Sequence, residues 1–383
     1  MKVLFLDQTG KLAGAERVLL DLVKPYQQEC LVGLFEDGPF QELLREQNTP
    51  VTVLARQPIE VKRESSLLQG FASLGKFMPL LLKTIKLSRH YDLIYANTPK
   101  AMVIGALASF FSNRPFVYHL HDILTPDHFS ATNRRLIVTL ANRFADRVIA
   151  VSQAARTAFI EAGGKAELVE VVYNGFEANK FQGYESERDS VRQELDFTNK
   201  FAIGHFCRLS PWKGQDVLLE ALTHCDDDVV AVFVGDALFG EEEYAAWLKQ
   251  QASDLNLTSR VKFLGFRRDV PRLMSGCDLV AHTSTSPEPA SRVLVETMLA
   301  GKPLIASRNG GTAELVEEGK MGWLFPSGDS VALAEIINQC RQQPQYTAEI
   351  AASGQKLASD RFTLEQNQQA IDNLLRLTLK QSA

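Results

Sequence analysis

Two glutamates eight positions apart, Glu288 and Glu296, lie in the segment SPEPASRVLVETMLAGKPLIAS, which spans residues 286–307. Glu288 follows a short apolar run through a loop rich in serine, threonine and proline. Glu296 lies within VLVETMLA, whose pattern suits a helix interior, and the prolines and serines before it suit a helix entrance. We therefore predict a helix that begins near Ser291, with one carboxylate before its first turn and the other inside it.

The first turn of an α-helix carries amide groups that have no partner within the helix, and these amides attract anions. Here they belong to about residues 290–293, which include Ser291, Arg292 and Val293. Helical side chains lean toward the N-terminus, so Glu296 can reach a group docked just outside this entrance. Carboxylates on both sides of an anion site suit a ligand whose phosphate has a hydroxyl-rich part on each side. A nucleotide sugar, with its ribose, diphosphate and hexose, has this layout.

The spacing of the two glutamates resembles the Glu-x7-Glu signature of the retaining glycosyltransferases of family 4, which have the GT-B fold. The resemblance implies that Glu288 contacts the transferred sugar and that Glu296 holds the ribose hydroxyls. Relatives often have Phe-Gly and a small or apolar residue between the glutamates, whereas this chain has Ala290, Ser291 and Arg292. Arg292 would either add a cation beside the diphosphate or form an outward salt bridge. The spacing by itself also fits a capped amphipathic helix with solvated glutamates.

Arg208 and Lys213 lie in CRLSPWKGQDVLLEAL, between a strand-like run and a helix-like run. A diphosphate leaving group gains negative charge as its glycosidic bond breaks, and two cations would stabilise that charge in the transition state. The segment is similar to the family's G-R-x(4–5)-K-G motif, with Cys207 in place of the glycine. The resemblance implies catalytic roles for both side chains. The alternative is a pair of solvated cations on an ordinary loop.

Two further loops resemble donor-binding segments of the family. The segment PLIASRNGGTAELV at residues 303–316 carries Gly310, and a glycine allows the backbone to approach a ligand closely. The segment FLGFRRDV at residues 263–270 lies where relatives hold the nucleobase, which implies donor contacts by backbone groups at Phe266 and Arg267. The alternative at Gly310 is an ordinary tight loop.

In the first half, Gly14 precedes a helix-like run, and His121 lies in the segment YHLHD at residues 118–122, at the end of a buried strand. The first loop resembles the family's glycine-containing loop, which implies that Gly14 approaches the sugar or its phosphate. It is not a GxGxxG fingerprint, so a nicotinamide dehydrogenase is the least favoured function. By the same resemblance, His121 corresponds to the histidine that touches the donor sugar. We expect His119 to point to the opposite face of the strand and to be structural.

Short apolar runs alternate with helix-like runs along the chain. The expected strands are residues 3–7, 30–35, 51–55, 92–97, 116–121, 147–152 and 168–174 in the first half, and 201–206, 229–235, 261–265, 278–283, 303–307 and 322–325 in the second. Near-continuous apolar strands separated by helices indicate parallel sheets covered on both faces. We therefore predict an α/β protein with two Rossmann-like, doubly wound sheets whose strand ends face a cleft, which matches the GT-B architecture.

A chain of 383 residues is long enough for two domains. The polar stretch 183–200 is the best candidate for a linker between them. We predict an N-terminal, acceptor-side domain over residues 1–182 and a C-terminal domain over residues 183–363 that binds the nucleotide sugar. By resemblance, the terminal amphipathic helix over residues 364–383 crosses back onto the first domain.

Charge and cysteine content argue against several classes of protein. Residues 1–180 carry 21 basic and 18 acidic residues, a net of +3, and the remainder carries 20 and 28, a net of −8. A nucleic-acid-binding domain would usually be basic throughout, so no nucleic-acid partner is expected. Five scattered cysteines without a CxxC pair indicate reduced thiols in a cytoplasmic protein. The N-terminal MKVLFLDQTG is typical of a first strand and not of a signal peptide.

No metal and no other cofactor is expected. The acidic tract Asp226–Asp228 is expected to be solvated. His119, His121, Asp122 and Asp127 have spacings possible for metal ligands, but we expect strand alternation to separate them.

Residues 67–89 interleave lysines with leucines and phenylalanines and contain no acidic residue. Such a basic amphipathic stretch suits a peripheral contact with an anionic membrane, although a core-packed helix with lysines reaching solvent explains it as well. No apolar run is long enough to cross a bilayer.

The residues and the resemblance together predict a retaining hexosyltransferase. It would move a hexose, from UDP-glucose first among donors, to a hydroxyl of a glycan or lipid-linked acceptor in polysaccharide biosynthesis. No carboxylate pair matches the glycosidase arrangement. Two alternatives stay open: a sugar-nucleotide 2-epimerase, which shares the fold but needs carboxylates as acid and base, and a non-catalytic sugar-nucleotide binding protein. The sequence leaves the oligomeric state and the acceptor open.

Overall fold

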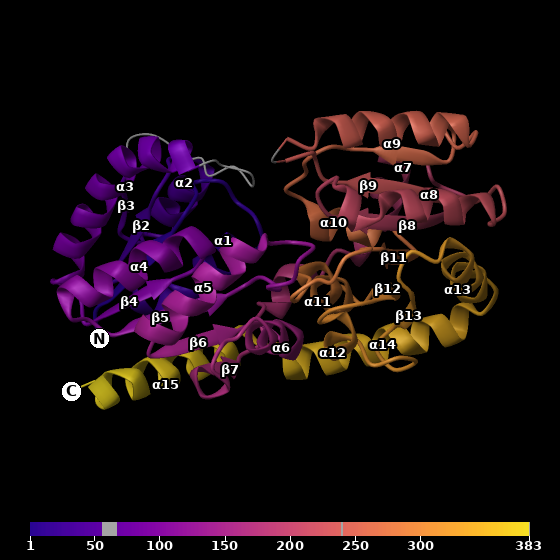
Figure 1. Ribbon diagram of the computed structural model, residues 1–383. Helices are drawn as coiled ribbons and strands as arrows, with labels where there is room; N and C mark the ends of the chain where they lie inside the picture. Colours follow the sequence, from indigo (N-terminus) through magenta and orange to yellow (C-terminus); the bar gives the residue numbers. More distant parts are fainter. Residues whose placement is uncertain (56–66, 239, 383) are drawn as a thin grey trace. The chain divides into compact units, whose positions relative to one another are not determined.

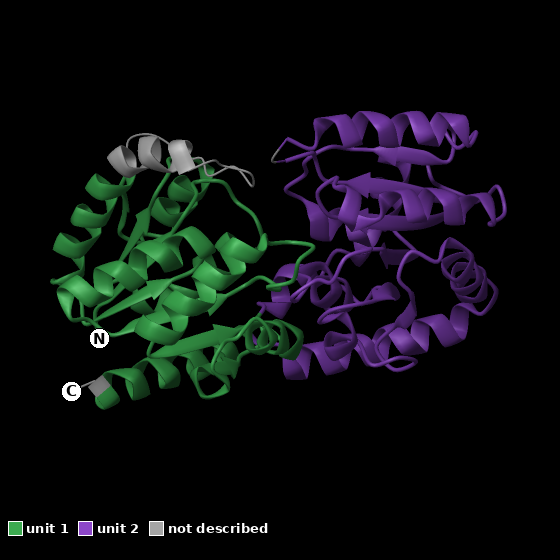
Figure 2. Ribbon diagram, viewed as in Figure 1, with its two compact units in different colours: residues 1–175, 364–383 green, residues 176–363 purple. Residues whose placement is uncertain are grey.

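The computed structural model describes residues 1–55, 67–238 and 240–382. The chain forms two compact units, each with its own sheet and hydrophobic core (Figure 2). Unit 1 comprises residues 1–175 and 364–383, and unit 2 comprises residues 176–363.

Unit 1 is built on a parallel sheet with the strand order β3-β2-β1-β4-β5-β6-β7 (Figure 1). Its strands are β1 (Val3–Asp7), β2 (Cys30–Leu34), β3 (Val51–Val53), β4 (Leu93–Ala96), β5 (Phe116–Leu120), β6 (Arg147–Ala150) and β7 (Val169–Val171). The chain starts in the middle, adds β2 and β3 on one side, and then adds β4 to β7 on the other. The loops after β1 and β4 therefore meet at the switch point of a doubly wound sheet.

Helices cover both faces of this sheet, which explains why β1, β4 and β5 are buried at every residue. They are α1 (Gly14–Leu22), α2 (Pro39–Glu46), α3 (Leu67–Ser88), α4 (Pro99–Ser112), α5 (Ala131–Phe144), α6 (Gln153–Glu161) and α15 (Leu364–Ser382).

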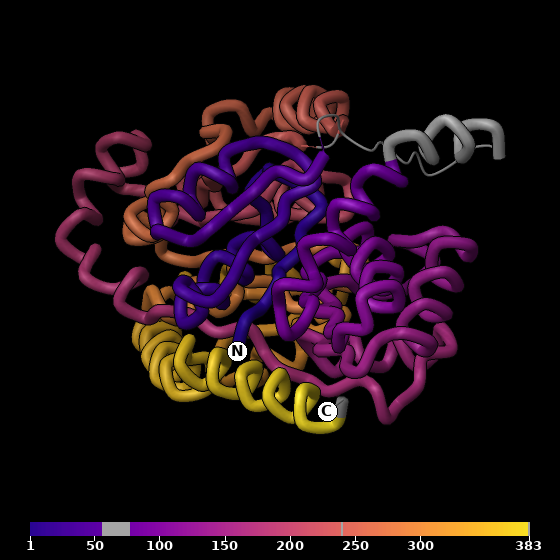
Figure 3. The backbone as a smooth tube through the Cα atoms, turned by 90° about the vertical axis from the view of Figure 1, so that its left-hand side faces the viewer, coloured from indigo at the N-terminus to yellow at the C-terminus, as the bar shows by residue number. Residues whose placement is uncertain are grey.

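The last helix, α15, belongs to unit 1 although it follows unit 2 in the chain; it is the yellow tube in Figure 3. Tyr26 Oη donates to Asp372 Oδ1 at 3.0 Å, and Gln368 Nε2 donates to the carbonyl of Asp21 at 2.8 Å. Ile371 and Leu375 of α15 are buried in the same cluster as Phe5 and Leu19 of the first strand and helix. The predicted return of the terminal helix to the first domain is confirmed.

Unit 2 repeats the plan with the strand order β10-β9-β8-β11-β12-β13. Its strands are β8 (Phe201–Phe206), β9 (Val229–Val234), β10 (Val261–Phe263), β11 (Leu279–His282), β12 (Leu304–Arg308) and β13 (Trp323–Pro326). Its helices are α7 (Arg188–Glu194), α8 (Gln215–Thr223), α9 (Glu242–Asp254), α10 (Val270–Ser275), α11 (Arg292–Leu299), α12 (Thr312–Leu315), α13 (Ser330–Gln342) and α14 (Pro344–Arg361). The loops after β8 and β11 meet at its switch point.

The boundary between the units lies before Phe176 and not after residue 182, as we had predicted. The amide of Phe176 donates to the carbonyl of Phe362 at 2.9 Å, and Phe176 pairs with Thr363 as an isolated parallel bridge. The guanidinium of Arg292 also lies over the Phe176 ring, 4.5 Å from its centroid. These contacts attach the segment that follows Gly175 to unit 2.

The predicted linker over residues 183–200 is not a linker. Its middle forms α7, whose Val191 is fully buried together with Leu195 and Phe197 in the core of unit 2. Arg192 is buried as well and pairs with Asp278, while its other nitrogens donate to backbone carbonyls. The linker prediction was wrong because the polarity of this segment comes partly from charged side chains, such as Arg192, that form ion pairs inside unit 2.

The stretch predicted to touch a membrane lies in α3. The side chains of residues 67–76 lie outside the described part of the chain. In the remainder, Leu80 and Leu81 are buried in the core, and Lys83 Nζ donates to the carbonyl of Val53 at 2.9 Å. In the described segments, no helix is both long enough and apolar enough to cross a membrane. Peripheral membrane contact stays a prediction.

We predict that Arg192→Ala destabilises unit 2 by about 2–3 kcal/mol, because it removes one of the two arginine partners of the partly buried Asp278 and leaves several backbone carbonyls without this donor. Urea unfolding followed by circular dichroism would measure the loss. Arg308→Ala is the matched control, because Arg308 pairs with Glu318 in solvent, and we expect it to cost at most about 1 kcal/mol. Equal effects of the two substitutions would contradict the structural role of Arg192.

Candidate functional site

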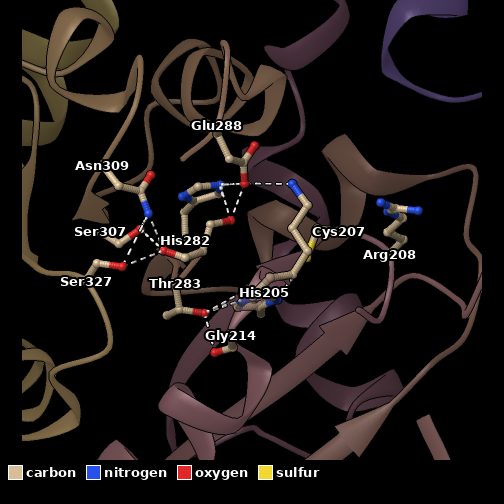
Figure 4. A network of polar contacts seen from close by, with 12 residues as sticks. His205, Cys207, Arg208, Gly214, His282, Thr283, Glu288, Ser307, Asn309 and Ser327 are labelled. Atoms are coloured by element: carbon tan, nitrogen blue, oxygen red, sulfur yellow. Dashed lines mark hydrogen bonds and ion pairs between the residues drawn. The ribbon is translucent and has the colours of Figure 1, made fainter. Parts of the chain in front are cut away.

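A buried carboxylate lies at the switch point of unit 2. Glu288, in the loop after β11, is only 3% exposed, and its Oε1 accepts three hydrogen bonds (Figure 4). Lys213 Nζ donates at 2.6 Å, His282 Nε2 lies at 2.9 Å, and the hydroxyl of Ser284 donates as well. In the described chain, no hydrogen bond to Oε2 is found. The contacts therefore fix one oxygen of the carboxylate, while the other keeps its capacity to accept hydrogen bonds.

The surroundings of Glu288 keep it ionised. Burial by itself raises the pKa of a carboxyl, but the charge of Lys213 and the contact with His282 act in the opposite direction and outweigh burial. The pKa of Glu288 is consequently held well below its usual value near 4.5. At neutral pH the site therefore contains a carboxylate and an ammonium in contact.

Gly310 positions the backbone of Glu288. Gly310 has φ of +47°, and a Cβ there would lie 2.3 Å from the carbonyl oxygen of Glu288. The amide of Gly311 donates to the same carbonyl at 2.7 Å. We predicted that Gly310 allows close approach of a ligand; the close approach that the structure shows is to Glu288 itself. The glycine is required because two loops pack against each other without room for a side chain.

Lys213 is held in place by a second tight contact. It ends the short 3-10 helix Pro211–Lys213, and Gly214 after it has φ of +64°. A Cβ on Gly214 would lie 2.0 Å from the carbonyl of Thr283, so only glycine permits this packing. The hydroxyl of Thr283 donates to the carbonyl of Gly214 at 2.6 Å. The loop after β8 is thus attached directly to the loop after β11.

The ring of Trp212 contacts both predicted cations. Lys213 Nζ lies 4.1 Å from the centroid of its ring, and the Arg208 guanidinium carbon lies 5.3 Å from it. An aromatic face attracts cations, which lets two positive groups share one loop. Arg208 also pairs with Glu241 at 3.5 Å and does not contact Glu288 (Figure 4). The structure therefore joins Lys213 to Glu288 directly, and it places Arg208 beside Lys213 through Trp212.

The helix after Glu288 begins as predicted. Ser291 is the residue before the first turn of α11, and the amide of Leu294 donates to the Ser291 carbonyl at 3.3 Å. Within the described residues, this leaves the amides of Arg292 and Val293 without hydrogen bonds. The amides of Ala290 and Ser291 likewise donate no hydrogen bond within the described residues, so the unpaired amides agree with the range 290–293 that we predicted.

The carboxylate of Glu296 forms an ion pair with a side chain of the same helix. Arg292 Nε donates to Glu296 Oε1 at 3.2 Å, and the two side chains are 15% and 18% exposed. Arg292 therefore forms a salt bridge along the helix, but the pair is mostly shielded from solvent and is not the outward salt bridge of the second predicted role. The predicted contact of Glu296 with ribose hydroxyls is not tested by this geometry.

The nucleobase loop is exposed. Phe266 is 58% exposed, and Gly265 before it has φ of +65° with open space on the side where a Cβ would lie. The guanidinium of Arg267 forms ion pairs with Asp269 at 2.7 Å and with Glu194 at 3.0 Å. Any contact of Arg267 with a base is therefore expected from its backbone. The assignment of this loop stays a prediction.

A second polar cluster lies at the switch point of unit 1. His121, after β5, has its Nε2 2.9 Å from Asn97 Oδ1, and Asn97 Nδ2 donates to Asp7 Oδ2 at 2.7 Å. Gly14 begins α1 nearby in the fold of unit 1, is exposed, and has open space where a Cβ would lie. The contacts of Gly14 and His121 with a sugar stay predictions.

His119 does not point away from His121. The centroids of the two rings lie 3.9 Å apart, because residues two positions apart in a strand share a face. The expectation of opposite faces was wrong for this reason. His119 Nδ1 lies 2.6 Å from Tyr95 Oη, and burial together with the neighbouring His121 lowers the pKa of His119 well below its usual value. His119 is therefore a neutral, buried support for His121.

Three carboxyl groups of unit 1 have raised pKa values. Burial, followed by the nearby Glu16, raises the pKa of Asp7 well above its usual value. Burial likewise raises the pKa of Glu16, with Asp122 as a smaller contribution. Burial raises the pKa of Asp122 to about 6, against the opposing effect of His128. These groups share a region of unit 1 where negative charge is unfavourable.

Comparisons with known proteins agree with the predicted resemblance. Residues 12–180 match the family model described as Glycosyltransferase Family 4, and residues 187–357 match the model described as Glycosyl transferases group 1. The crystal structure of Anabaena HepE in complex with UDP-glucose is 53% identical to this chain; the match covers 98% of this chain and 99% of that one, with a TM-score of 0.92. The chain belongs to the family 4 glycosyltransferases.

Other similar proteins are more distant. Spore coat protein SA of Bacillus subtilis is 31% identical over 49% of this chain, and the amylovoran biosynthesis glycosyltransferase AmsK of Erwinia amylovora is 30% identical over 48%. The alignments span 51% and 44%, about half, of these two relatives. Sucrose-phosphate synthase from Thermosynechococcus elongatus is 18% identical with a TM-score of 0.82, which shows the fold alone. Two doubly wound units in this family confirm the predicted GT-B fold.

Several residues of this family 4 glycosyltransferase were missed by sequence reasoning. His282 and Ser284 bind Glu288, Trp212 contacts both cations, and Asn97 and Asp7 support His121. His282 and Asp7 had a detectable signal, since each is a polar residue at the end of an otherwise apolar strand. Trp212 and Ser284 had none, because both lie in loops whose conformation the pattern does not determine.

The part of the chain that the structure describes contains no group of three or more histidines, cysteines or acidic residues suited to hold a metal ion. The acidic tract Asp226–Asp228 is exposed to solvent, as expected, and Arg341 pairs at the surface with Asp226 at 2.7 Å and with Asp228 at 2.8 Å. Independence from metals stays a prediction.

We predict that Glu288→Gln costs about 3 kcal/mol of stability at neutral pH, because it removes the counterion of a mostly buried Lys213. The folded-state pKa of Glu288 is lowered, so its stabilising contribution is present above the unfolded pKa and lost only as the pH falls through the lower folded value. The cost should therefore stay constant between about pH 8 and pH 5 in urea unfolding of both proteins. A cost that declines steadily from about pH 7 to pH 5 would mean that the pKa is raised instead.

Proposed function

We propose that this chain is a retaining glycosyltransferase that moves a hexose, with UDP-glucose as the favoured donor, to a hydroxyl of a glycan or lipid-linked acceptor. The observation that carries the proposal is the similarity to Anabaena HepE over nearly the whole of both chains, since that protein was crystallised with UDP, with UDP-glucose and with UDP plus glucose. The role in polysaccharide biosynthesis is supported by the likeness to the amylovoran glycosyltransferase.

The geometry of unit 2 supports a diphosphate site at the entrance of α11. Lys213 is charged and 11% exposed, and the unpaired amides of Arg292 and Val293 belong to the first turn that follows the Glu288 loop. Amides at a helix entrance and an ammonium both stabilise phosphate oxygens. Lys213 has three ammonium hydrogens, so it can keep its bond to Glu288 Oε1 while it donates to a phosphate oxygen. Arg208, held through Trp212, supplies the second positive charge.

In the proposed reaction, one bond breaks, one bond forms and one proton is transferred. The bond between the anomeric carbon and the phosphate oxygen breaks, and a bond from that carbon to the acceptor oxygen forms. The acceptor proton passes to the departing diphosphate on the same face of the sugar, which retains the anomeric configuration. The negative charge that develops on UDP is stabilised by Lys213, Arg208 and the helix amides. No carboxylate has to act as a covalent nucleophile in this account.

Glu288 is suited to orient the sugar. Its Oε1 is fixed by Lys213, His282 and Ser284, and Oε2 stays available as a hydrogen-bond acceptor for sugar hydroxyls. A carboxylate whose rotamer is locked loses little entropy when it binds a ligand. By the family resemblance, His121 also contacts the sugar in this proposal, and Glu296 turns from Arg292 to the ribose.

Two other functions are compatible with the family resemblance. A sugar-nucleotide 2-epimerase would need a carboxyl acid and base, and the low pKa of Glu288 makes it a poor general acid. A non-catalytic binding protein would have no use for a cation pair that acts in the transition state. Incubation with the donor alone distinguishes these functions, because an epimerase converts the sugar, whereas a transferase gives slow hydrolysis and a binding protein leaves the donor intact.

We expect UDP-glucose to stabilise the protein more than GDP or ADP sugars in a thermal-shift panel. A donor at 100 times its dissociation constant adds about 2.7 kcal/mol. Nuclear magnetic resonance of the product formed on a glycan or lipid-linked acceptor should show the anomeric configuration of the donor. A product of inverted configuration would contradict the retaining mechanism, and a larger shift with a GDP sugar would contradict the donor assignment.

We predict that Lys213→Ala and Arg208→Ala each lower kcat by about 10²–10³, because each removes a preorganised charge beside the leaving group. Steady-state kinetics with UDP-glucose measures the loss. Lys320→Ala is the control, because Lys320 is 69% exposed and pairs with Glu317 at the surface. Losses below about tenfold in both variants, with the fold intact by circular dichroism, would remove the catalytic role.

A further inference from the structure

Three consecutive buried polar residues, His282, Thr283 and Ser284, end β11 and begin the loop after it. Two of them contact Oε1 of Glu288, which is ionised at neutral pH and can only accept hydrogen bonds. His282 Nε2, 2.9 Å from Oε1, must therefore carry a hydrogen, and the hydroxyl of Ser284 must direct its hydrogen to the same oxygen. The contact with Glu288 thus determines which ring nitrogen of His282 is protonated.

The backbone of Ser284 is held by the next two strands of the sheet. Its carbonyl accepts hydrogen bonds from Ser307 Oγ at 2.7 Å, from Ser327 Oγ at 3.1 Å and from Nδ2 of Asn309 (Figure 4). Ser307 lies in β12, Asn309 follows that strand directly, and Ser327 follows β13. Ser284 is fully buried, so water does not replace these contacts. Two strands therefore fix the position from which the Ser284 hydroxyl reaches Glu288.

Thr283, between these two residues, contacts a different loop. The carbonyls of Lys213 and Gly214 face its hydroxyl at 3.0 Å and 2.6 Å, and a carbonyl can only accept. The hydroxyl hydrogen is therefore directed to these carbonyls, and its oxygen accepts from His205 Nε2 at 2.9 Å. His205 and His282 thus both carry a hydrogen on Nε2, but each donates it to a different side chain. The two histidines provide an internal control for each other.

We propose that His282 and Ser284 are positioning residues that hold Oε1 of Glu288 and so fix the direction in which Oε2 accepts hydrogen bonds from the transferred sugar. The role of Oε2 rests on the proposed function, whereas the hold on Oε1 rests only on contacts within unit 2. Of the three groups that contact Oε1 in the described part of the chain, only Lys213 would remain without them. A carboxylate with one partner can rotate about its side-chain bonds, and misplaced groups lose much of their effect on a reaction.

The hydrogen on His282 can be located in the whole chain without any ligand. Two-bond proton–nitrogen correlation spectra of protein labelled with ¹⁵N-histidine show which ring nitrogen carries hydrogen. The spectrum of His282→Gln identifies the His282 signals among those of the seven histidines. We expect a hydrogen on Nε2 of His282 near neutral pH. A neutral ring with its hydrogen on Nδ1 would overturn the proposal.

Two substitutions in the loop after β11 provide a crossed control in the same spectra. Glu288→Ala removes the acceptor of His282, so we expect an Nδ1–H fraction to appear for His282 while His205 keeps its hydrogen on Nε2. Thr283→Val has a similar shape and removes the acceptor of His205, so it should have the reverse effect. If each variant changes both rings equally, the hydrogen positions follow general packing and the proposed hold on Glu288 is wrong.

The kinetic test uses two replacements of His282. His282→Gln keeps a donor near the position of Nε2, whereas His282→Leu has none. We expect kcat for transfer from UDP-glucose to be about tenfold lower in His282→Leu than in His282→Gln, the value of about one hydrogen bond. The KM for the donor should change less than about twofold, because the proposed diphosphate contacts do not involve His282. Equal kcat values in the two variants would show that His282 only fills space and would overturn its positioning role.

Ser284 is tested in the same way, with a control at an exposed histidine. Ser284→Ala removes the second donor, so we expect a loss of kcat of about tenfold, and an unchanged kcat would overturn the role of Ser284. His224→Leu is the matched control for His282→Leu, because His224 is exposed at the end of α8, and we expect it to keep wild-type kcat. If wild-type protein transfers no sugar while His282 carries its hydrogen on Nε2, the proposed function fails and the hold on Glu288 stands.

Discussion

The ion pair between Lys213 and Glu288 joins two loops that lie 75 residues apart in the chain. Both groups are taken from water, so neither is stable there without the other: an uncompensated buried charge costs about 3–5 kcal/mol. The pair therefore requires the loops after β8 and β11 to be docked closely. Gly214 permits that docking, and Gly310 lets the loop after β12 pack on Glu288, since a Cβ on either glycine would collide with the backbone of the loop after β11. Packing and charge thus support each other at one point of the fold.

The two units use the same topological feature for their polar clusters. In each sheet the chain reverses direction of winding, at β1 and β4 in unit 1 and at β8 and β11 in unit 2, so that the following loops part and expose strand ends. Unit 1 places Asp7 and Asn97 there in a buried hydrogen-bonded series. Unit 2 places an ammonium and a carboxylate there. The two clusters therefore differ in charge: the one in unit 1 is a hydrogen-bonded series that ends at an imidazole, and the one in unit 2 is a buried ion pair.

The structure also explains why some charges in this chain are structural and others are suited to a ligand. Within unit 2, ion pairs with acidic side chains hold the guanidinium groups of Arg192, Arg267 and Arg341. Arg192 also donates to backbone carbonyls. Lys213 differs because its ammonium is held by one carboxylate oxygen and by an aromatic face, and both contacts leave donor capacity. Composition therefore cannot distinguish a structural polar segment such as α7 from a loop that binds a ligand. The contacts of the charged side chains make that distinction.

Sequence alone determined the α/β class, the positions of the strands and the residues that carry the family motifs. It could do so because buried parallel strands are continuous apolar runs, and because Glu288, Glu296, Arg208 and Lys213 keep a fixed order and spacing. Only the tertiary structure decided which of these groups meet. Contacts such as His282 with Glu288, Trp212 with the two cations and Asn97 with His121 depend on loop conformation and on strands that are distant in sequence. Local patterns hold no information about such pairings, because a residue's partner across a sheet is chosen by the packing of the whole domain.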